Sequence, residues 1–156
     1  MNVLTRNNFL IDWPLAYVGI TRNWLSVDEA LHEISPEELG KLSAEVIASL
    51  YTASEKSKEC FLAVVKEIAN LDDATTSANL RIWGIGYLDD IMKSFKTVSD
   101  KLKAVADVWA MVDYPEEWKP FIYYMPVPPG TETSMDLLYK KFSEFLKKEK
   151  LKLGCE

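Results

Sequence analysis

The single histidine, His32, is the first candidate for chemistry, because an imidazole can act as a general base or bind a metal ion. Glu29 lies three residues before it, so a helix would place both side chains on one face as a Glu-x-x-His motif. Di-iron helical bundles need two such motifs and two further carboxylates, whereas this chain has no second histidine. We therefore expect His32 to be an ordinary surface or packing residue, and we expect no metal ion and no other cofactor.

Two cysteines and a glycine pair are the next candidates. Cys60 adjoins Phe61 on an apolar stripe and is expected in the core, and Cys155 lies one residue from the end. Neither has a histidine or a basic cluster beside it that would lower the pKa of its thiol. The segment Gly84–Gly86 lies inside a helical stripe, and Asp89 stands where a dinucleotide-binding loop needs its third glycine. We expect these glycines to let helices approach closely or to kink the helix, and we predict that the chain is not an enzyme.

Two stretches of the chain, 23–40 and 104–118, carry acidic residues and no Lys or Arg. The second also contains Trp and Tyr, and aromatic anchors beside carboxylates are typical of a surface that binds a basic protein. Acids in the first turn of a helix also have a purely structural reason, because they stabilise the helix dipole. We weigh these two interpretations equally. The candidate partner-binding residues are Asp28, Glu33, Asp113, Glu117, Trp118, Tyr123 and Tyr124.

The chain as a whole is acidic, with 24 Asp and Glu against 18 Lys and Arg and a formal net charge of −6. Affinity for nucleic acids depends largely on Lys and Arg that neutralise phosphates, so direct binding of DNA or RNA is not expected. Residues 133–152 differ from the rest, because they are predicted to form a basic C-terminal helix. An acidic body with a basic last helix indicates a cationic partner, internal charge complementarity or a solvated lysine face.

The secondary-structure elements that must position these residues are predicted to be helices, because apolar residues recur along the chain at helical spacing. Apolar residues recur at helical spacing in the segments 13–24, 39–51, 61–71, 80–95, 98–112 and 135–146. Hydroxyl residues that can cap a helix start lie at Ser26, Ser35, Thr52, Thr97 and Thr133, each three residues before an acid. We predict an all-α fold, formed by a single domain over residues 1–156 with six to eight mostly antiparallel helices.

Two irregular segments interrupt this pattern. Residues 126–130 hold three prolines and are expected to form an extended connection. Residues 121–125 are the one β-prone run, and we expect either a short extended segment or a helical turn there. No apolar run approaches the roughly 20 residues that a membrane helix needs, and the N-terminus lacks a signal-peptide pattern. These features predict a cytoplasmic protein that does not enter a membrane.

The order of several short motifs resembles a family of small bacterial proteins of unknown biochemical function. The motifs are Trp13–Gly19, Asn23–Ser26, Leu80–Trp83, Asp113–Glu116 and Phe121–Pro126, of which the last two are the most specific. The resemblance covers most of residues 10–126, and the segment from residue 131 adds nothing to it. Some related small acidic proteins are immunity proteins of polymorphic or contact-dependent toxin systems. The resemblance therefore implies an immunity protein that binds and neutralises a cognate toxin domain of the basic nuclease type.

Two alternatives from other functional classes remain open. One is a helical adaptor or scaffold protein without a toxin partner, and the other is an enzyme with an unrecognised site. A gene for a large secreted toxin immediately upstream would favour the immunity hypothesis over the adaptor hypothesis.

Overall fold

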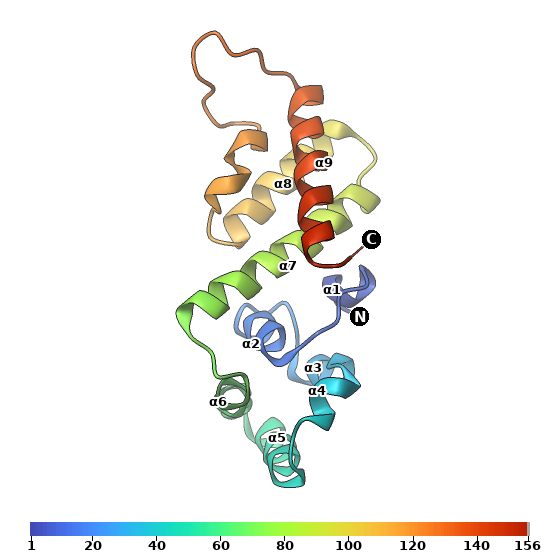
Figure 1. Ribbon diagram of the computed structural model, residues 1–156, viewed down its shortest axis with the longest axis vertical. Coiled ribbons are helices and arrows are strands. Elements are labelled where there is room, and N and C mark those ends of the chain that lie inside the picture. The colour runs from blue at the N-terminus through green and yellow to red at the C-terminus, as the bar shows by residue number, and fades with distance from the viewer. Residues whose placement is uncertain (156) are drawn as a thin grey trace. The chain divides into compact units, whose positions relative to one another are not determined.

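The computed structural model describes residues 1–155, and helix accounts for 71% of it. Within this range there is no strand, and Ile11 and Ile34 form an isolated β-bridge. The all-α prediction is therefore confirmed (Figure 1). The helices in chain order are α1 (Val3–Arg6), α2 (Trp13–Thr21), α3 (Val27–Glu33), α4 (Pro36–Gly40), α5 (Ala44–Lys56), α6 (Lys58–Ala69), α7 (Asp73–Ser94), α8 (Val98–Met111), the 3₁₀ helix η1 (Glu116–Phe121) and α9 (Met135–Lys152).

The chain forms two compact units. The first, which we call the N-terminal unit, is Met1–Trp83, and the C-terminal unit begins at Gly84. Helix α7 contributes its first part to one unit and its second part to the other. The single domain expected over residues 1–156 stays a prediction.

Ten helices in the described residues exceed the predicted six to eight. The additional ones are short, since α1 has 4 residues, α4 has 5 and η1 has 6. One or two helical turns cannot display the i, i+3, i+4, i+7 pattern on which the prediction rested. Local capping starts these helices instead, as where the side chain of Asn2 accepts a hydrogen bond from the backbone N–H of Leu4 at 2.8 Å.

Most of the predicted helix starts are found. Ser26, Ser35 and Thr97 each accept a hydrogen bond from the backbone N–H three residues further on. Ser26 forms the complete capping box, because the carboxylate of Glu29 accepts the backbone N–H of Ser26 at 3.0 Å. Helix α9 is capped by Ser134, one residue after the predicted start of the basic C-terminal helix.

Two predictions between residues 39 and 57 are wrong. The apolar stripe 39–51 spans two helices, because α4 ends at Gly40 and α5 begins at Ala44 behind the cap Ser43. Thr52 does not start a helix, since α5 continues through it to Lys56. The break lies at Ser57, whose backbone is extended at φ −164°. Apolar spacing does not register an interruption of so few residues, and a Thr-x-x-Glu sequence also occurs inside a helix.

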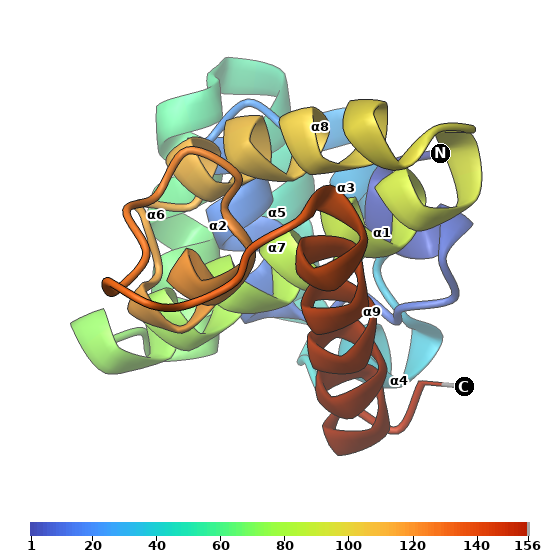
Figure 2. The same cartoon turned by 90° about the horizontal axis from the view of Figure 1, so that it is seen from above.

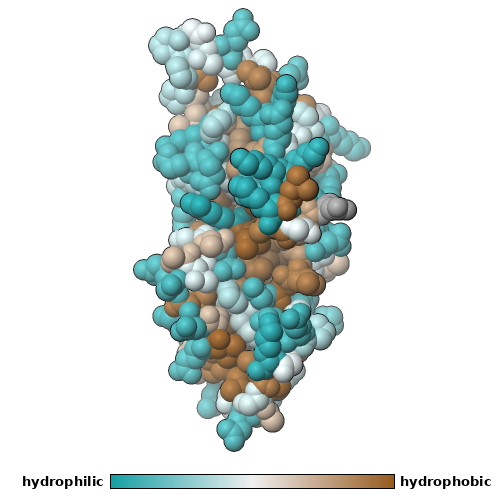
Figure 3. All heavy atoms as spheres, viewed as in Figure 1, coloured by the Kyte–Doolittle hydropathy of each residue, from teal (hydrophilic) through white to brown (hydrophobic). Residues whose placement is uncertain are grey.

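The core of the N-terminal unit forms where α2 packs against α6, and α6 in turn packs against α5. Trp83 at the end of this unit is fully buried, and its indole N–H donates a hydrogen bond to the carbonyl of Leu15 at 2.9 Å. Gly19 allows this packing, because a Cβ at that position would collide with the Trp83 ring. On the face seen in Figure 3, hydrophilic side chains predominate, and apolar side chains reach the surface between them, including over α5 and α6.

The core of the C-terminal unit is aromatic. Trp118 and Phe121 of η1 are both buried, with ring centroids 6.2 Å apart, and Phe121 lies 5.8 Å from Phe142 of α9. Helix α7 approaches this cluster at Gly84, where an added Cβ would lie 3.1 Å from two atoms of the Trp118 ring. The expectation that this glycine permits close approach is confirmed.

The Pro-rich connection 126–130 lies in an irregular segment between η1 and α9. Both views show this connection as an arch without helix (Figures 1 and 2). The β-prone run 121–125 begins as the last residue of η1 and continues as a turn, so the helical alternative is the closer one. Helices α8 and α9 pack against each other and cross steeply in Figure 2, unlike the expected antiparallel arrangement. No helix within residues 1–155 is both long enough and apolar enough to span a membrane.

Candidate functional site

Three exposed tyrosines and one buried tryptophan form a continuous series of ring contacts in the C-terminal unit. Tyr114, Tyr123 and Tyr124 are 56%, 44% and 53% exposed, and we call these three rings the tyrosine surface. Trp109 of α8 supports it, with ring centroids 4.9 Å from Tyr114 in an edge-to-face contact and 6.1 Å from Tyr124. Tyr123 and Tyr124 form a second edge-to-face pair at 5.2 Å. Such contacts hold aromatic rings in place, so the surface is preorganised.

The backbone that carries Tyr114 is strained. Helix α8 ends at Met111, and Asp113 and Tyr114 follow with φ of 63° and 55°. Two hydrogen bonds hold the turn, from the Tyr114 N–H to the carbonyl of Trp109 and from the Trp109 indole N–H to the carbonyl of Pro115, both at 2.9 Å. Glycine is the residue that usually follows a helix in this conformation, because a Cβ there costs roughly 1–2 kcal/mol per residue. The chain nevertheless carries two side chains, and both are exposed.

Acidic side chains adjoin the tyrosine surface in sequence. Asp113 immediately precedes Tyr114, and Glu117 lies in the first turn of η1; both are exposed. The nearest base along the chain is Lys119, whose ammonium group forms an ion pair with Glu116 at 2.7 Å. Residues 104–118 hold four acids and no Lys or Arg, so the formal charge of this segment is negative, and a positively charged partner would complement it.

Trp118 is a correction to the predicted partner-binding residues. Its side chain is 1% exposed and packs against Phe121, Phe145 and the backbone at Gly84. A ring in the core cannot contact a partner unless the unit opens. The sequence contained one signal for this outcome, because an interior glycine such as Gly84 requires a large neighbour to fill the space that it leaves.

Glu33 is a second correction, because its carboxylate is used inside the N-terminal unit. It accepts hydrogen bonds from the hydroxyl of Thr5 at 2.8 Å and from the side-chain amide of Asn2, and its side chain is 11% exposed. Its contacts tie α3 to α1 and give it a structural role. Asp28 of the same helix is exposed, so it remains available at the surface.

The structure thus brings together two of the predicted residues, Tyr123 and Tyr124, and adds Tyr114, which the sequence analysis did not select. Asp113 lies beside this group in the chain, because it directly precedes Tyr114. Pro115, shortly after the apolar stripe 98–112, is a signal for the helix end there, but the sequence does not show that the Tyr114 ring lies on Trp109.

The motifs tested for chemistry have structural explanations. Glu29 caps α3, and the hydrogen bond from the backbone N–H of Ser26 lowers the pKa of its carboxyl below the ordinary value of 4.5. His32 is exposed, and no group of three or more His, Cys, Asp or Glu within residues 1–155 could hold a metal ion. Cys60 is exposed, so its predicted place in the core is wrong. Cys60 lies in the first turn of α6, one position before the buried Phe61, and its side chain therefore faces away from the core.

A family model matches most of the chain. The model of the family described as "Uncharacterized protein conserved in bacteria (DUF2247)" matches residues 1–150. The chain belongs to this family. The match extends beyond the 10–126 segment of the sequence resemblance and includes most of the basic helix α9. No curated protein and no solved structure matches the chain significantly.

Proposed function

We propose that this member of the family is a protein-binding module whose tyrosine surface captures a basic protein domain. The observation that carries the proposal is the set of three exposed tyrosine rings, of which Tyr114 and Tyr124 contact Trp109 and Tyr123 contacts Tyr124. Tyrosine is enriched among the residues that dominate binding energy at interfaces, since it buries a large ring with few rotatable bonds. Monomeric surfaces have no structural need to expose three such rings together.

The strained turn supports the same conclusion. Replacement of Asp113 or Tyr114 by glycine would relieve backbone strain at each position, yet both side chains project from the turn into solvent. Strained backbone positions that persist in proteins cluster at sites of binding and catalysis. The conformation costs stability and places one carboxylate next to one aromatic ring, which is the combination that a cationic partner would contact.

The finer proposal is that the partner is a cognate toxin domain of the nuclease type, and that the protein is its cytoplasmic immunity protein. A nuclease carries a basic surface that binds phosphates. An acidic inhibitor can cover that surface, and carboxylates such as Asp113 and Glu117 would steer the encounter. The resemblance of short motifs to families with immunity members adds to this argument.

A binding and protection experiment tests both levels of the proposal. The product of the gene immediately upstream is expressed with the wild-type chain, and bacterial survival and the dissociation constant are measured. A variant with Tyr123→Ala and Tyr124→Ala is expected to bind at least about tenfold more weakly, because interface tyrosines contribute 1 kcal/mol or more each. Tyr51→Ala is the matched control, since Tyr51 is also about half exposed, at 49%, but lies on α5 in the N-terminal unit.

Three outcomes separate the hypotheses. Protection that is lost in the double variant and retained in the Tyr51 control supports an immunity protein that uses the tyrosine surface. Protection that survives in the double variant removes this surface from the interface. Absence of any binding to the neighbouring gene product overturns the immunity proposal and favours the adaptor hypothesis.

A further inference from the structure

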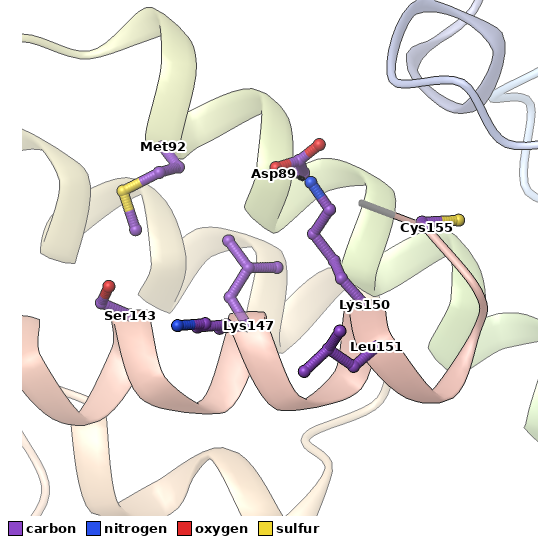
Figure 4. A pocket seen from close by; sticks show the side chains of 8 residues that line it. Asp89, Met92, Ser143, Lys147, Lys150, Leu151 and Cys155 are labelled. Atoms are coloured by element: carbon purple, nitrogen blue, oxygen red, sulfur yellow. Dashed lines mark hydrogen bonds and ion pairs between the residues drawn. The ribbon is translucent and has the colours of Figure 1, made fainter.

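A second feature of the C-terminal unit is a pocket between the last part of α7 and the outer face of α9. Its volume is about 470 Å³, which lies within the usual range of small-molecule sites. Ser143, Lys147 and Leu151 line it from α9 at steps of four residues, so they share one face of that helix (Figure 4). This pocket takes no part in the tyrosine surface.

The pocket carries excess positive charge. Asp89 of α7 is buried, and its two carboxylate oxygens lie 2.7 Å from the ammonium group of Lys93 and 3.0 Å from that of Lys150. Lys93 does not line the pocket, so among the lining residues Asp89 faces one positive charge, that of Lys150. Lys147 adds another, and within residues 1–155 its ammonium group forms no ion pair. Figure 4 shows Lys150 reaching from α9 to Asp89, and Lys147 extending toward the Ser143 end of the view.

The remaining walls are apolar. Met92 lines the pocket from α7, and Leu146 and Leu151 line it from α9. Leu151 is 64% exposed, so it contributes little to the core and leaves an apolar side chain at the rim. The flexible thioether of methionine adapts to ligands of differing shape. A ligand with both an anionic group and an apolar body would match these two kinds of wall.

The geometry points to a binding site for a small aliphatic carboxylate. The carboxylate lies near the Lys147 ammonium group and the Ser143 hydroxyl, and the hydrocarbon chain covers Met92 and Leu151. A single negative charge suits the site, because Asp89 offsets one of the two positive charges that Lys147 and Lys150 bring to the lining. Burial of the hydrocarbon chain supplies the apolar part of the affinity, and the ammonium group orients the ligand.

Titration calorimetry with three probes tests the ligand class. Octanoate carries both features, octanol has the same chain without the charge, and acetate has the charge without the chain. We expect saturable, stoichiometric binding of octanoate and affinities at least about tenfold weaker for octanol and acetate, since each lacks one part of the interaction. Equal affinity for octanoate and octanol would overturn the proposal, because the lysine would then have no role.

Two variants locate the site with matched controls. Lys147→Gln is expected to weaken octanoate binding by about tenfold, whereas Lys148→Gln is not, because Lys148 is exposed and does not line the pocket. Leu151→Ser is expected to weaken octanoate binding, while Leu153→Ser, at another exposed leucine, is not. Thermal unfolding of each variant shows that it remains folded. Octanoate affinity that is unchanged in both Lys147→Gln and Leu151→Ser would place the ligand elsewhere and overturn the proposal.

Discussion

Tyr114 shows how a single residue can serve binding at the expense of stability. Its φ of 55° is unfavourable for any side chain with a Cβ, and its ring is 56% exposed. The edge-to-face contact with Trp109 returns about 0.5–1.5 kcal/mol, which is similar to the strain. The residue is therefore close to neutral for folding, and its exposed ring is left for a partner.

The first prediction is that Tyr114→Gly separates binding from stability. The free energy of unfolding is expected to change by less than about 1 kcal/mol, because relief of strain offsets the lost ring contact. Binding to the proposed basic partner domain is expected to weaken by about tenfold or more, mainly through a faster off-rate. Urea unfolding and surface plasmon resonance measure the two quantities. Tyr114→Phe keeps the ring and serves as the control; equal binding by the Gly variant and the wild type would exclude Tyr114 from the interface.

Asp12 shows a different conflict at the residue scale, between burial and capping. It is the N-cap of α2, and its carboxylate accepts the backbone N–H of Leu15 at 2.9 Å. Burial raises the pKa of this carboxyl above 3.8, and the negative charge of Glu38 raises the pKa further, against the opposing effect of the Leu15 hydrogen bond. The folded state therefore favours the protonated form more than the unfolded state does.

The second prediction follows from that direction. The ionised carboxyl of Asp12 costs stability above its folded pKa, and this cost disappears as the pH falls below 3.8. Asp12→Asn keeps the capping oxygen without the charge, so it is expected to raise the free energy of unfolding at pH 7 and to lose this advantage near pH 3. Urea unfolding at both pH values measures the difference. Asp12→Ala removes the cap and is expected to lower stability by about 1 kcal/mol. An Asn variant that is less stable than the wild type at pH 7 would contradict the argument.

Among the elements, the junction between α5 and α6 depends on one residue. Ser57 donates its backbone N–H to the carbonyl of Ala53 at 3.2 Å, which ends α5. Its hydroxyl accepts the backbone N–H of Cys60 at 3.1 Å, which starts α6. The extended backbone of this single residue allows α5 and α6 to fold back and pack against each other.

The third prediction is that Ser57→Ala lowers the free energy of unfolding by about 1 kcal/mol, because it leaves the N–H of Cys60 without its cap. Ser54→Ala is the control within the same segment. The Ser54 hydroxyl bonds back to the carbonyl of Tyr51 inside α5, and alanine favours a helix, so a change of less than about 0.5 kcal/mol is expected. Urea unfolding compares the two variants. A larger loss of unfolding free energy in Ser54→Ala than in Ser57→Ala would contradict this prediction and place the start of α6 near residue 54.

For the whole molecule, the distribution of charge matters more than its total. The formal net charge is −6, yet α9 carries exposed lysines while the segment 104–118 carries acids and no base. A cationic partner would therefore be attracted to one part of the surface more than to another. Such steering acts on the association rate and is screened over about 8–10 Å at physiological ionic strength.

The fourth prediction is that Asp113→Lys combined with Glu117→Lys slows association with the proposed basic partner domain by about tenfold at low salt, with little change at high salt. Glu55→Lys combined with Glu67→Lys is the control, because it changes the net charge equally at two exposed acids of α5 and α6. Stopped-flow association rates over a series of salt concentrations measure the effect. Equal slowing by both pairs would indicate that net charge alone attracts the partner, without a role for the position of the acids.

Local patterns in the sequence were sufficient for the fold class and for the bounds of some of the longer helices. The stripe 98–112 corresponds to α8 at Val98–Met111, and the predicted basic helix 133–152 corresponds to α9 at Met135–Lys152. Periodicity and capping depend on residues within a few positions of one another, so one sequence displays them directly. Periodicity does not predict helices of one or two turns, such as α1 and α4, because they contain too few residues to repeat a pattern.

Which residues form the candidate site depends on contacts between residues that are distant in the chain. Only the tertiary structure shows these contacts. Trp118 and Tyr124 are both aromatic residues of one acidic-aromatic region, yet Trp118 is in the core beside Gly84 and Tyr124 is exposed on Trp109. Glu33 and Glu117 were equivalent as acids near helices, yet Thr5 and Asn2 occupy the carboxylate of Glu33. The sequence determined that this protein is helical, acidic and rich in aromatic residues. Which side chains remain at the surface depended on packing between helices, because burial is a property of the neighbours that surround a residue and not of the residue itself.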